Sequence, residues 1–207
     1  MIELVRSKEF AWLFLLFLSL TSVTAWVVAN PPMQDQFASI SVLGADMTAT
    51  NYFPAGNSTI TPQEAVQWNV FVYNHLGTAQ LFLLTMKLAN QTISGPSSPT
   101  NTPNAGKILM QTYRAVLGNE TWNIPINWFV DSFTNTTTPQ GNTIGIDSVN
   151  VNGQLTNGTM ISANGGQNFR IVLELEAYDF QTGSFVFSFR SNGTVRSVWD
   201  QIWFSLK

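Results

Sequence analysis

The chain has 207 residues, about the length of one ordinary domain with a short addition, and a formal net charge of −3. Asp, Glu, Lys and Arg make up 10% of it, against about 25% in ordinary soluble domains, whereas the hydrophobic share of 44% is close to average. Its basic residues are scattered and form no stripe that would neutralise phosphates, so we expect no nucleic-acid partner. One histidine and no cysteine exclude thiol nucleophiles, disulfides, thiolate metal sites and sites that need two imidazoles. We therefore expect no catalytic residue, no metal and no cofactor.

The first element in chain order is an uncharged apolar run over residues 10–29, FAWLFLLFLSLTSVTAWVVA. A helix of about twenty residues rises about 30 Å, which matches the hydrocarbon thickness of a bilayer. Trp12 and Trp26 lie near its two ends, where indole rings prefer the membrane interface. The run therefore predicts one N-terminal transmembrane helix.

Basic residues set the expected orientation of this helix. Arg6 and Lys8 precede the apolar run, so the positive-inside bias places residues 1–9 in the cytoplasm and residues 30–207 outside the cell. A cleaved signal peptide is the alternative, because small residues near the end of the run stand where a signal peptidase would cut. Both interpretations export the rest of the chain.

Small and hydroxylated side chains gather in the outer half of the run, at Ser19, Thr21, Ser22, Thr24 and Ala25. Lipid offers such side chains no partner, whereas small residues let two helices approach closely and hydroxyl groups hydrogen-bond between helices. We therefore expect this segment to contact a transmembrane helix of another protein. The alternatives are that the hydroxyls bind carbonyls of their own helix, or that the cluster belongs to a signal-peptide cleavage region.

Beyond residue 32, apolar and polar residues alternate in short stretches that Gly, Pro and Asn clusters interrupt, which is typical of β-strands. Residues 38–42 alternate with serines, and the run at 80–89 is almost wholly apolar, as in a strand that is buried on both faces. Asn152-Gly153 favours a tight hairpin turn. The expected strands lie at 36–43, 66–73, 80–89, 107–117, 121–129, 144–151, 154–161, 169–178, 184–190 and 195–206.

Two polar segments, at 94–106 and 134–141, are expected to be surface loops. Because strands follow one another with no amphipathic helix of useful length, the sequence predicts an all-β fold. An antiparallel β-sandwich of the Ig-like kind is favoured over a barrel or a mixed fold. We expect residues 30–207 to form this one extracytoplasmic domain after the transmembrane helix at 10–29.

Three short stretches carry further patterns. They are Ser-Val-Leu-Gly at 41–44 with Ala-Thr-Asn-Tyr-Phe-Pro at 49–54, Phe-Val-Tyr-Asn-His-Leu-Gly at 71–77, and Leu-Glu-Leu-Glu-Ala-Tyr at 173–178 with Thr-Gly-Ser-Phe at 182–185. These patterns resemble the archaeal membrane-associated family of the DUF1616 domain, whose function is not established. The resemblance implies an exported β-sandwich with an archaeal source and no catalytic residue. Leu76 departs from the family's pattern, in which an acidic residue follows Asn-His, and members often have several spans.

Few side chains suggest chemistry. His75 would need nearby carboxylates for a catalytic or metal-binding role, and a turn residue bonded to local backbone is the alternative. Glu174 and Glu176 lie on one face of a predicted strand, where paired carboxylates do acid/base chemistry or hold calcium. Solvent-facing acids, with Arg170 and Arg190 as cross-strand partners, are the alternative explanation. We expect the structural explanation in both cases.

Six N-glycosylation sequons lie on the side of the helix that we expect to be exported. They are at Asn57, Asn90, Asn119, Asn135, Asn157 and Asn192. Most fall in predicted turns, where a glycan disturbs no strand pairing. We expect glycans on at least two of them, first at Asn57 and Asn135, because their Pro, Gly and Thr neighbours indicate exposed loops.

Together these observations predict a non-catalytic accessory or structural subunit of an archaeal membrane or cell-envelope complex, which displays a glycosylated β-domain outside the cell. Its expected partners are membrane lipid, other integral membrane or envelope proteins, and N-glycans. A second hypothesis is a secreted filament or surface-layer subunit, whose strand at 36–43 pairs with a neighbouring subunit after its leader is removed. A third hypothesis, a copper or calcium enzyme domain, is disfavoured by the single histidine.

Overall fold

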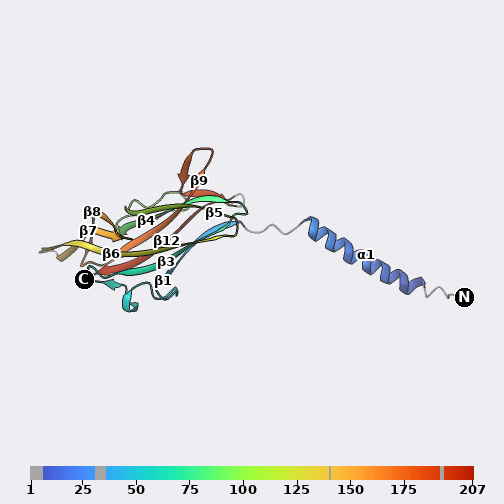
Figure 1. The fold of residues 1–207 in the computed structure, drawn as a ribbon, viewed down its shortest axis with the longest axis horizontal. Coiled ribbons are helices and arrows are strands. Elements are labelled where there is room, and N and C mark those ends of the chain that lie inside the picture. Colours follow the sequence, from blue (N-terminus) through green and yellow to red (C-terminus); the bar gives the residue numbers. More distant parts are fainter. Residues whose placement is uncertain (1–6, 31–35, 140, 192–193) are drawn as a thin grey trace. The chain divides into compact units, whose positions relative to one another are not determined.

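The computed structural model describes residues 7–30, 36–139, 141–191 and 194–207 (Figure 1). The chain divides into two compact units, residues 1–35 and residues 36–207. The first unit contains one helix, and the second contains all the strands described. The predicted fold class is confirmed: an all-β domain follows one apolar helix.

Helix α1 (Ser7–Ala29) contains the segment Phe10–Ala29, which is long and apolar enough to cross a membrane. The helix ends at Ala29, and the next residue, Asn30, donates from both its backbone nitrogen and its Nδ2 to the Trp26 carbonyl, at 2.8 and 3.1 Å. The Asn30 side chain is therefore a second donor to a carbonyl that already accepts the last helical hydrogen bond. The length and composition of α1 fit both a membrane span and a signal sequence.

Two β-sheets form the second unit. The first has the strand order β1 (Phe37–Gly44), β3 (Val66–His75), β6 (Thr121–Thr138), β7 (Gly141–Val151), β8 (Gln154–Asn164). The second has the order β11 (Ser188–Ser191), β12 (Thr194–Leu206), β9 (Phe169–Asp179), β4 (Gln80–Asn90), β5 (Lys107–Val116), with β10 (Ser184–Val186) on β9 and β2 (Thr59–Ile60) on β12. Every described pair is antiparallel except β2 with β12. A short 3-10 helix, η1 (Pro54–Gly56), precedes β2.

The core lies between the two sheets because apolar side chains alternate along their strands. Every second residue of β3, from Val66 to Val72, is buried. Trp128 of the first sheet packs edge-on against Phe204 of the second, with 5.3 Å between ring centroids. Such aromatic pairs add about 0.5–1.5 kcal/mol to the free energy gained by burying their area.

The predicted loop at 134–141 is wrong over most of its length. β6 continues to Thr138 and pairs with β7 from Gly141 onward, so this segment forms a hairpin. Its side chains at 134–137 are all exposed. Alternation of apolar and polar residues, the signal of a half-buried strand, is therefore missing from this part of the sequence. The predicted strand at 184–190 is likewise two short strands, β10 and β11.

Candidate functional site

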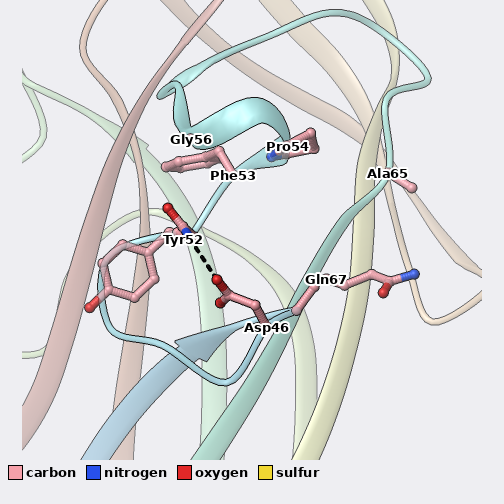
Figure 2. A pocket seen from close by; sticks show the side chains of 9 residues that line it. Asp46, Tyr52, Phe53, Pro54, Gly56, Ala65 and Gln67 are labelled. Carbon is pink, nitrogen blue, oxygen red and sulfur yellow. Dashed lines mark hydrogen bonds between the residues drawn. The ribbon is translucent and has the colours of Figure 1, made fainter.

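The loop between β1 and β2, residues 45–58, separates two surface hollows. The larger has a volume of about 600 Å³ and is lined by this loop together with Ala65 and Gln67 (Figure 2). The smaller has a volume of about 390 Å³ and is lined by the loop and by residues 200–203 of β12. Tyr52 lines both hollows. The loop therefore forms the wall, as we call residues 45–58 below, between two hollows, and each hollow is open to a ligand.

Hydrogen bonds to Asp46 fix the first half of this wall. Its carboxylate accepts from the Thr48 backbone nitrogen at 3.1 Å and from Asn51 Nδ2 at 2.6 Å, the bond drawn in Figure 2. These bonds, that of Asn51 above all, hold the pKa of Asp46 below its ordinary value. Gly44 is needed beside the turn, because a Cβ there would lie 1.8 Å from the Asn51 carbonyl oxygen. Asp46 therefore shapes the loop.

The second half of the wall is anchored in the core. Trp68 Nε1 donates to the Tyr52 carbonyl at 2.6 Å. The buried Phe53 ring lies 6.0 Å from the Trp68 ring and 6.4 Å from the Phe204 ring. Pro54 begins η1, where its missing N–H costs no hydrogen bond. Because Trp68 and Phe204 belong to different sheets, the wall is fixed to both.

The smaller hollow lies along β12, where the described strands leave one edge open. β11 pairs with β12 up to Ser197, and β2 pairs with it from Ser205 onward. Between them, the Asp200 carboxylate accepts from the Gln201 backbone nitrogen at 2.7 Å. Partial burial raises the pKa of Asp200 above its ordinary value. The exposed ring of Trp203 offers a ligand a stacking surface, and Asp200 and the open edge of β12 offer it hydrogen-bonding groups.

A cluster of buried charges lies on the outer face of the second sheet, beneath the segment at 91–106. Glu174 of β9 is fully buried, and its Oε2 lies 2.6 Å from Nζ of Lys87 on β4. Glu174 Oε1 accepts from the Asn104 backbone nitrogen at 2.5 Å, and Lys87 Nζ donates to the Asn104 carbonyl at 2.9 Å. The ion pair therefore holds Asn104 and its segment on the sheet.

This cluster corrects the expectation of solvent-facing acids paired with Arg170 and Arg190. Glu174 is buried and pairs with Lys87 of the neighbouring strand. Glu176 is half-buried, and burial raises its pKa above the ordinary value. The side chain of Arg190 lies outside the described residues. Glu174 therefore holds the segment at 91–106 from a buried position rather than facing solvent.

Arg170 holds the other end of the segment at 91–106. Its guanidinium donates to the Ile93 carbonyl and, at 2.7 Å, to Gln201 Oε1. It also lies 4.9 Å from the centre of the Trp203 ring, a cation–π distance. Side chains of β4 and β9 thus fix both ends of a segment that the sequence predicts only as a surface loop.

His75 lies at the end of β3 and contacts neutral partners. Its Nδ1 is 2.5 Å from Asn119 Oδ1 and 3.3 Å from the Tyr73 hydroxyl. The preceding Asn74 is buried, and its Nδ2 donates to the Val116 carbonyl at 2.9 Å. These contacts join the end of β3 to the turn between β5 and β6, which is a structural role. In the described parts of the chain, no three His, Cys, Asp or Glu side chains lie close enough to hold a metal ion.

The sequons differ in exposure. The exposed ones are Asn57, Asn119, Asn135 and Asn157. Asn90 is only 8% exposed, and its Nδ2, the atom that would carry a glycan, donates to the Ser162 carbonyl at 2.7 Å. A glycan on Asn90 is therefore incompatible with this fold, which corrects the expectation for that sequon. Asn192 lies outside the described residues.

The hydroxyls of α1 bind carbonyls of their own helix. Ser19, Thr21, Ser22 and Thr24 each donate to a carbonyl three or four residues earlier, at 2.7 to 3.0 Å. Each hydroxyl oxygen keeps a lone pair for another donor. Together with Ala25, these side chains are exposed, and their contact with a partner helix stays a prediction. Arg6 lies outside the described residues.

Sequence reasoning missed several residues that shape these sites, among them Lys87, Asp46 and Asp200. A lone charge within an apolar run, as at Lys87, is itself a signal for a buried ion pair. Asp46 followed by Thr48 is a typical Asx turn. Asp200 carries no such local signal, because its environment depends on which strands border β12.

No protein-family model and no curated protein matches the chain. Among solved structures, it is similar to the CARDB domain of a Pyrococcus furiosus protein, crystallised with di-metal ions, at TM-score 0.39 and 9% identity over 86% of this chain and 94% of that one. It is also similar to a Listeria innocua beta-glucosidase, at TM-score 0.39 and 8% identity over 83% of this chain and 16% of that one. A Bacillus subtilis sporulation control protein matches at TM-score 0.35 and 9% identity over 82% of this chain and 49% of that one. None of these similarities assigns a function to the chain.

Proposed function

We propose that the chain is a membrane-attached, non-catalytic accessory or structural subunit of an archaeal membrane or cell-envelope complex, and that it presents its β-sandwich outside the cell. The observation that carries this proposal is the exposure of the apolar helix α1: no residue of Phe10–Ala29 is buried. Apolar surface gains about 25 cal/mol per Å² when it leaves water. A helix with this much uncovered apolar surface therefore needs a bilayer or an apolar partner.

Sequence features support the orientation and the setting. Arg6 and Lys8 precede α1, which favours an N-terminus in the cytoplasm. The exposed sequons offer attachment points for glycans on the β-sandwich, and the archaeal source follows from the resemblance to the DUF1616 family. The hollows beside the loop at 45–58 fit a subunit that binds rather than reacts.

The test combines four measurements on the native protein. Protease added to intact cells is expected to cleave the β-sandwich, and an N-terminus that still includes α1 is expected for an anchor. Glycopeptide mapping should find sugar on Asn57 or Asn135 and none on Asn90. Isolation in mild detergent should retain co-purifying membrane or envelope proteins. Protection of the β-sandwich until the cells are lysed would reverse the orientation.

A second candidate function has one observation in its favour. β1 lies at the edge of the first sheet and pairs with β3 alone among the described strands. An open edge accepts a strand from another molecule, as in the alternative of a secreted filament or surface-layer subunit. A mature N-terminus that lacks α1, together with assembly that proline substitution at Ser41 abolishes, would favour this second function over the first.

A further inference from the structure

The hairpin that joins β9 to β10 carries three aromatic rings, two of which pack against the third. The Tyr178 ring packs edge-on against Phe180 at 5.1 Å and against Phe185 at 5.3 Å. Phe180 is 79% exposed, the largest value for any aromatic side chain whose exposure the structure describes. We call Tyr178, Phe180 and Phe185 the aromatic tip. Three joined rings on one hairpin make a larger apolar surface than a single exposed side chain.

The turn of this hairpin holds Phe180 in a fixed position. Asp179 accepts from the Gln181 backbone nitrogen at 2.8 Å and from Thr182 Oγ1 at 3.0 Å. Its carbonyl accepts from the Gly183 nitrogen at 2.8 Å, and Gly183 has a φ of 67°, which glycine adopts without strain. The ring is therefore preorganised for contact, so binding loses little conformational entropy.

Strand register places the aromatic tip at the end of the sandwich where β1 begins. Phe37, the first residue of β1, pairs with His75, the last residue of β3. β4 begins shortly afterwards at Gln80, whose Nε2 donates to the Tyr178 carbonyl at 2.9 Å. Exposed Leu117 belongs to the same end, since the β5–β6 turn is bonded to the end of β3.

Chain connectivity keeps this end near any membrane that α1 crosses. α1 ends at Ala29 and β1 begins at Phe37, so the connection spans at most about 29 Å when fully extended. The β6–β7 hairpin at Thr138 lies at the opposite end of the sandwich, because β6 runs on from Thr121 at this end to Thr138, a length of about 55 Å. The connection is therefore long enough for this end of the β-sandwich, with the aromatic tip, to reach a bilayer that α1 crosses.

We propose that the aromatic tip rests in the outer interface of the bilayer that α1 spans, with Phe180 among the lipid headgroups. This inference rests on the proposed membrane attachment. Aromatic rings favour this layer, where an apolar body and a hydrated surrounding meet. The segment at 178–186 has one charged side chain, Asp179, and its carboxylate is already bonded within the turn. The three rings themselves carry no charge, so their contact with zwitterionic lipid needs no charged surface opposite them.

The absence of cysteine from the chain allows a direct test with single labels. The full chain carrying Phe180→Cys, labelled with an environment-sensitive fluorophore, is reconstituted in phosphatidylcholine vesicles with and without bromine on the acyl chains. Met160→Cys is the matched control: Met160 is 80% exposed and adjoins Ile161, which the register places level with Phe133 in the distal half of β6. Leu16→Cys, within α1, reports whether the helix itself is inserted.

We expect the label at residue 180 to emit at shorter wavelength in vesicles and to be quenched roughly two-fold by brominated lipid, as interfacial burial requires. The label at residue 160 should show neither change. If the label at residue 16 is quenched while that at 180 behaves like the one at 160, the aromatic tip does not contact lipid, although the attachment stands. Quenching at neither 16 nor 180 overturns both proposals. The same labelled protein can also be measured in native membranes. If the emission of the label at residue 180 shifts there but not in vesicles, the aromatic tip contacts a protein partner, and this inference is overturned.

Discussion

Lys87 and Glu174 place two opposite charges where both side chains are almost completely buried, and removing water from each costs several kcal/mol. Their attraction, and the bonds that both make to Asn104, offset this cost. A pair of this kind adds little net stability over apolar residues of the same volume, but losing one partner leaves the other charge buried alone. Its evident effect is to fix the position of the segment at 91–106.

Lys87→Met should therefore destabilise the β-sandwich by about 3–5 kcal/mol, because the carboxylate of Glu174 stays buried without its cation. Adding Glu174→Leu to Lys87→Met should restore part of the loss. Arg114→Met is the control, since the Arg114–Glu120 pair is solvent-exposed and should cost less than about 1 kcal/mol. Urea denaturation of the full chain in detergent measures all three. If Lys87→Met and Arg114→Met lower the free energy of unfolding equally, the buried ion pair contributes no more to stability than the exposed one.

Asp200 gives the β-sandwich a predictable dependence on pH. Burial raises its pKa in the folded state, so the unfolded chain releases this proton first. As pH rises above the ordinary carboxyl value of about 4, the free energy of unfolding therefore falls until the folded-state pKa is passed. Asp200→Asn removes this titration and keeps an oxygen for the Gln201 nitrogen.

The urea midpoint of Asp200→Asn should therefore exceed that of the wild type at about pH 7 and equal it at about pH 3, where both states of the wild type are protonated. Glu176 has a raised pKa for the same reason, so the variant should retain part of the wild-type slope. An identical difference between the two proteins at both pH values would mean that Asp200 is not the titrating group.

At the scale of elements, the strands with regularly placed or continuous buried apolar residues are the predictable ones. β3 and β9 follow from their apolar residues, and Asn152-Gly153 correctly marks the β7–β8 turn. The end of β6 is not predictable, because its exposed Thr and Asn side chains carry no periodic signal. The hollows beside the loop at 45–58 are not predictable either, since they depend on tertiary pairings such as Trp68 with the Tyr52 carbonyl. The segment at 91–106 shows the same limit, because partners distant in sequence determine its position.

Gly44 is the last residue of β1 and precedes the loop at 45–58 that separates the two hollows. A substitution at Gly44 therefore tests how tightly β1 and this loop pack together. A Cβ at this position would meet the carbonyl of Asn51, so Gly44→Ala should displace the loop and cost about 1–3 kcal/mol. Gly145→Ala in β7 is the control, because its Cβ would lie 3.8 Å from Ser162 Cβ, an ordinary contact. Calorimetry of both variants gives the comparison. A melting temperature unchanged by Gly44→Ala would show that the loop shifts freely away from β1.

At the scale of the whole molecule, the low charge content determines how the stability and solubility of the β-sandwich depend on pH. With 10% charged residues, the β-sandwich has few carboxylates whose protonation would unbalance its surface, so its pH dependence is concentrated in partly buried acids such as Asp200 and Glu176. Its solubility then depends on Asn, Thr, Ser and on any attached glycans rather than on net charge. Within α1, the segment Phe10–Ala29 contains no charged residue and is long and apolar enough to cross a membrane.

The last prediction concerns what lies beside α1. The hydroxyls of Ser19, Thr21, Ser22 and Thr24 are already bonded to helix carbonyls, so replacing all four with Leu leaves no backbone group unsatisfied and preserves insertion. The replacement removes the small side chains that let a second helix approach, a contact worth about 0.6 kcal/mol per hydrogen bond in measured cases. We therefore expect the yield of co-purifying membrane proteins to fall several-fold.

Phe14→Leu with Phe17→Leu is the control for this variant, because it changes apolar side chains in the inner half of the helix and leaves the hydroxyl cluster intact. Its yield of partners should match that of the wild type. Undiminished recovery of partners with the four-leucine variant would mean that α1 serves only as an anchor. The association would then have to be made by the β-sandwich, whose open strand edges and surface hollows would become the next contacts to disrupt.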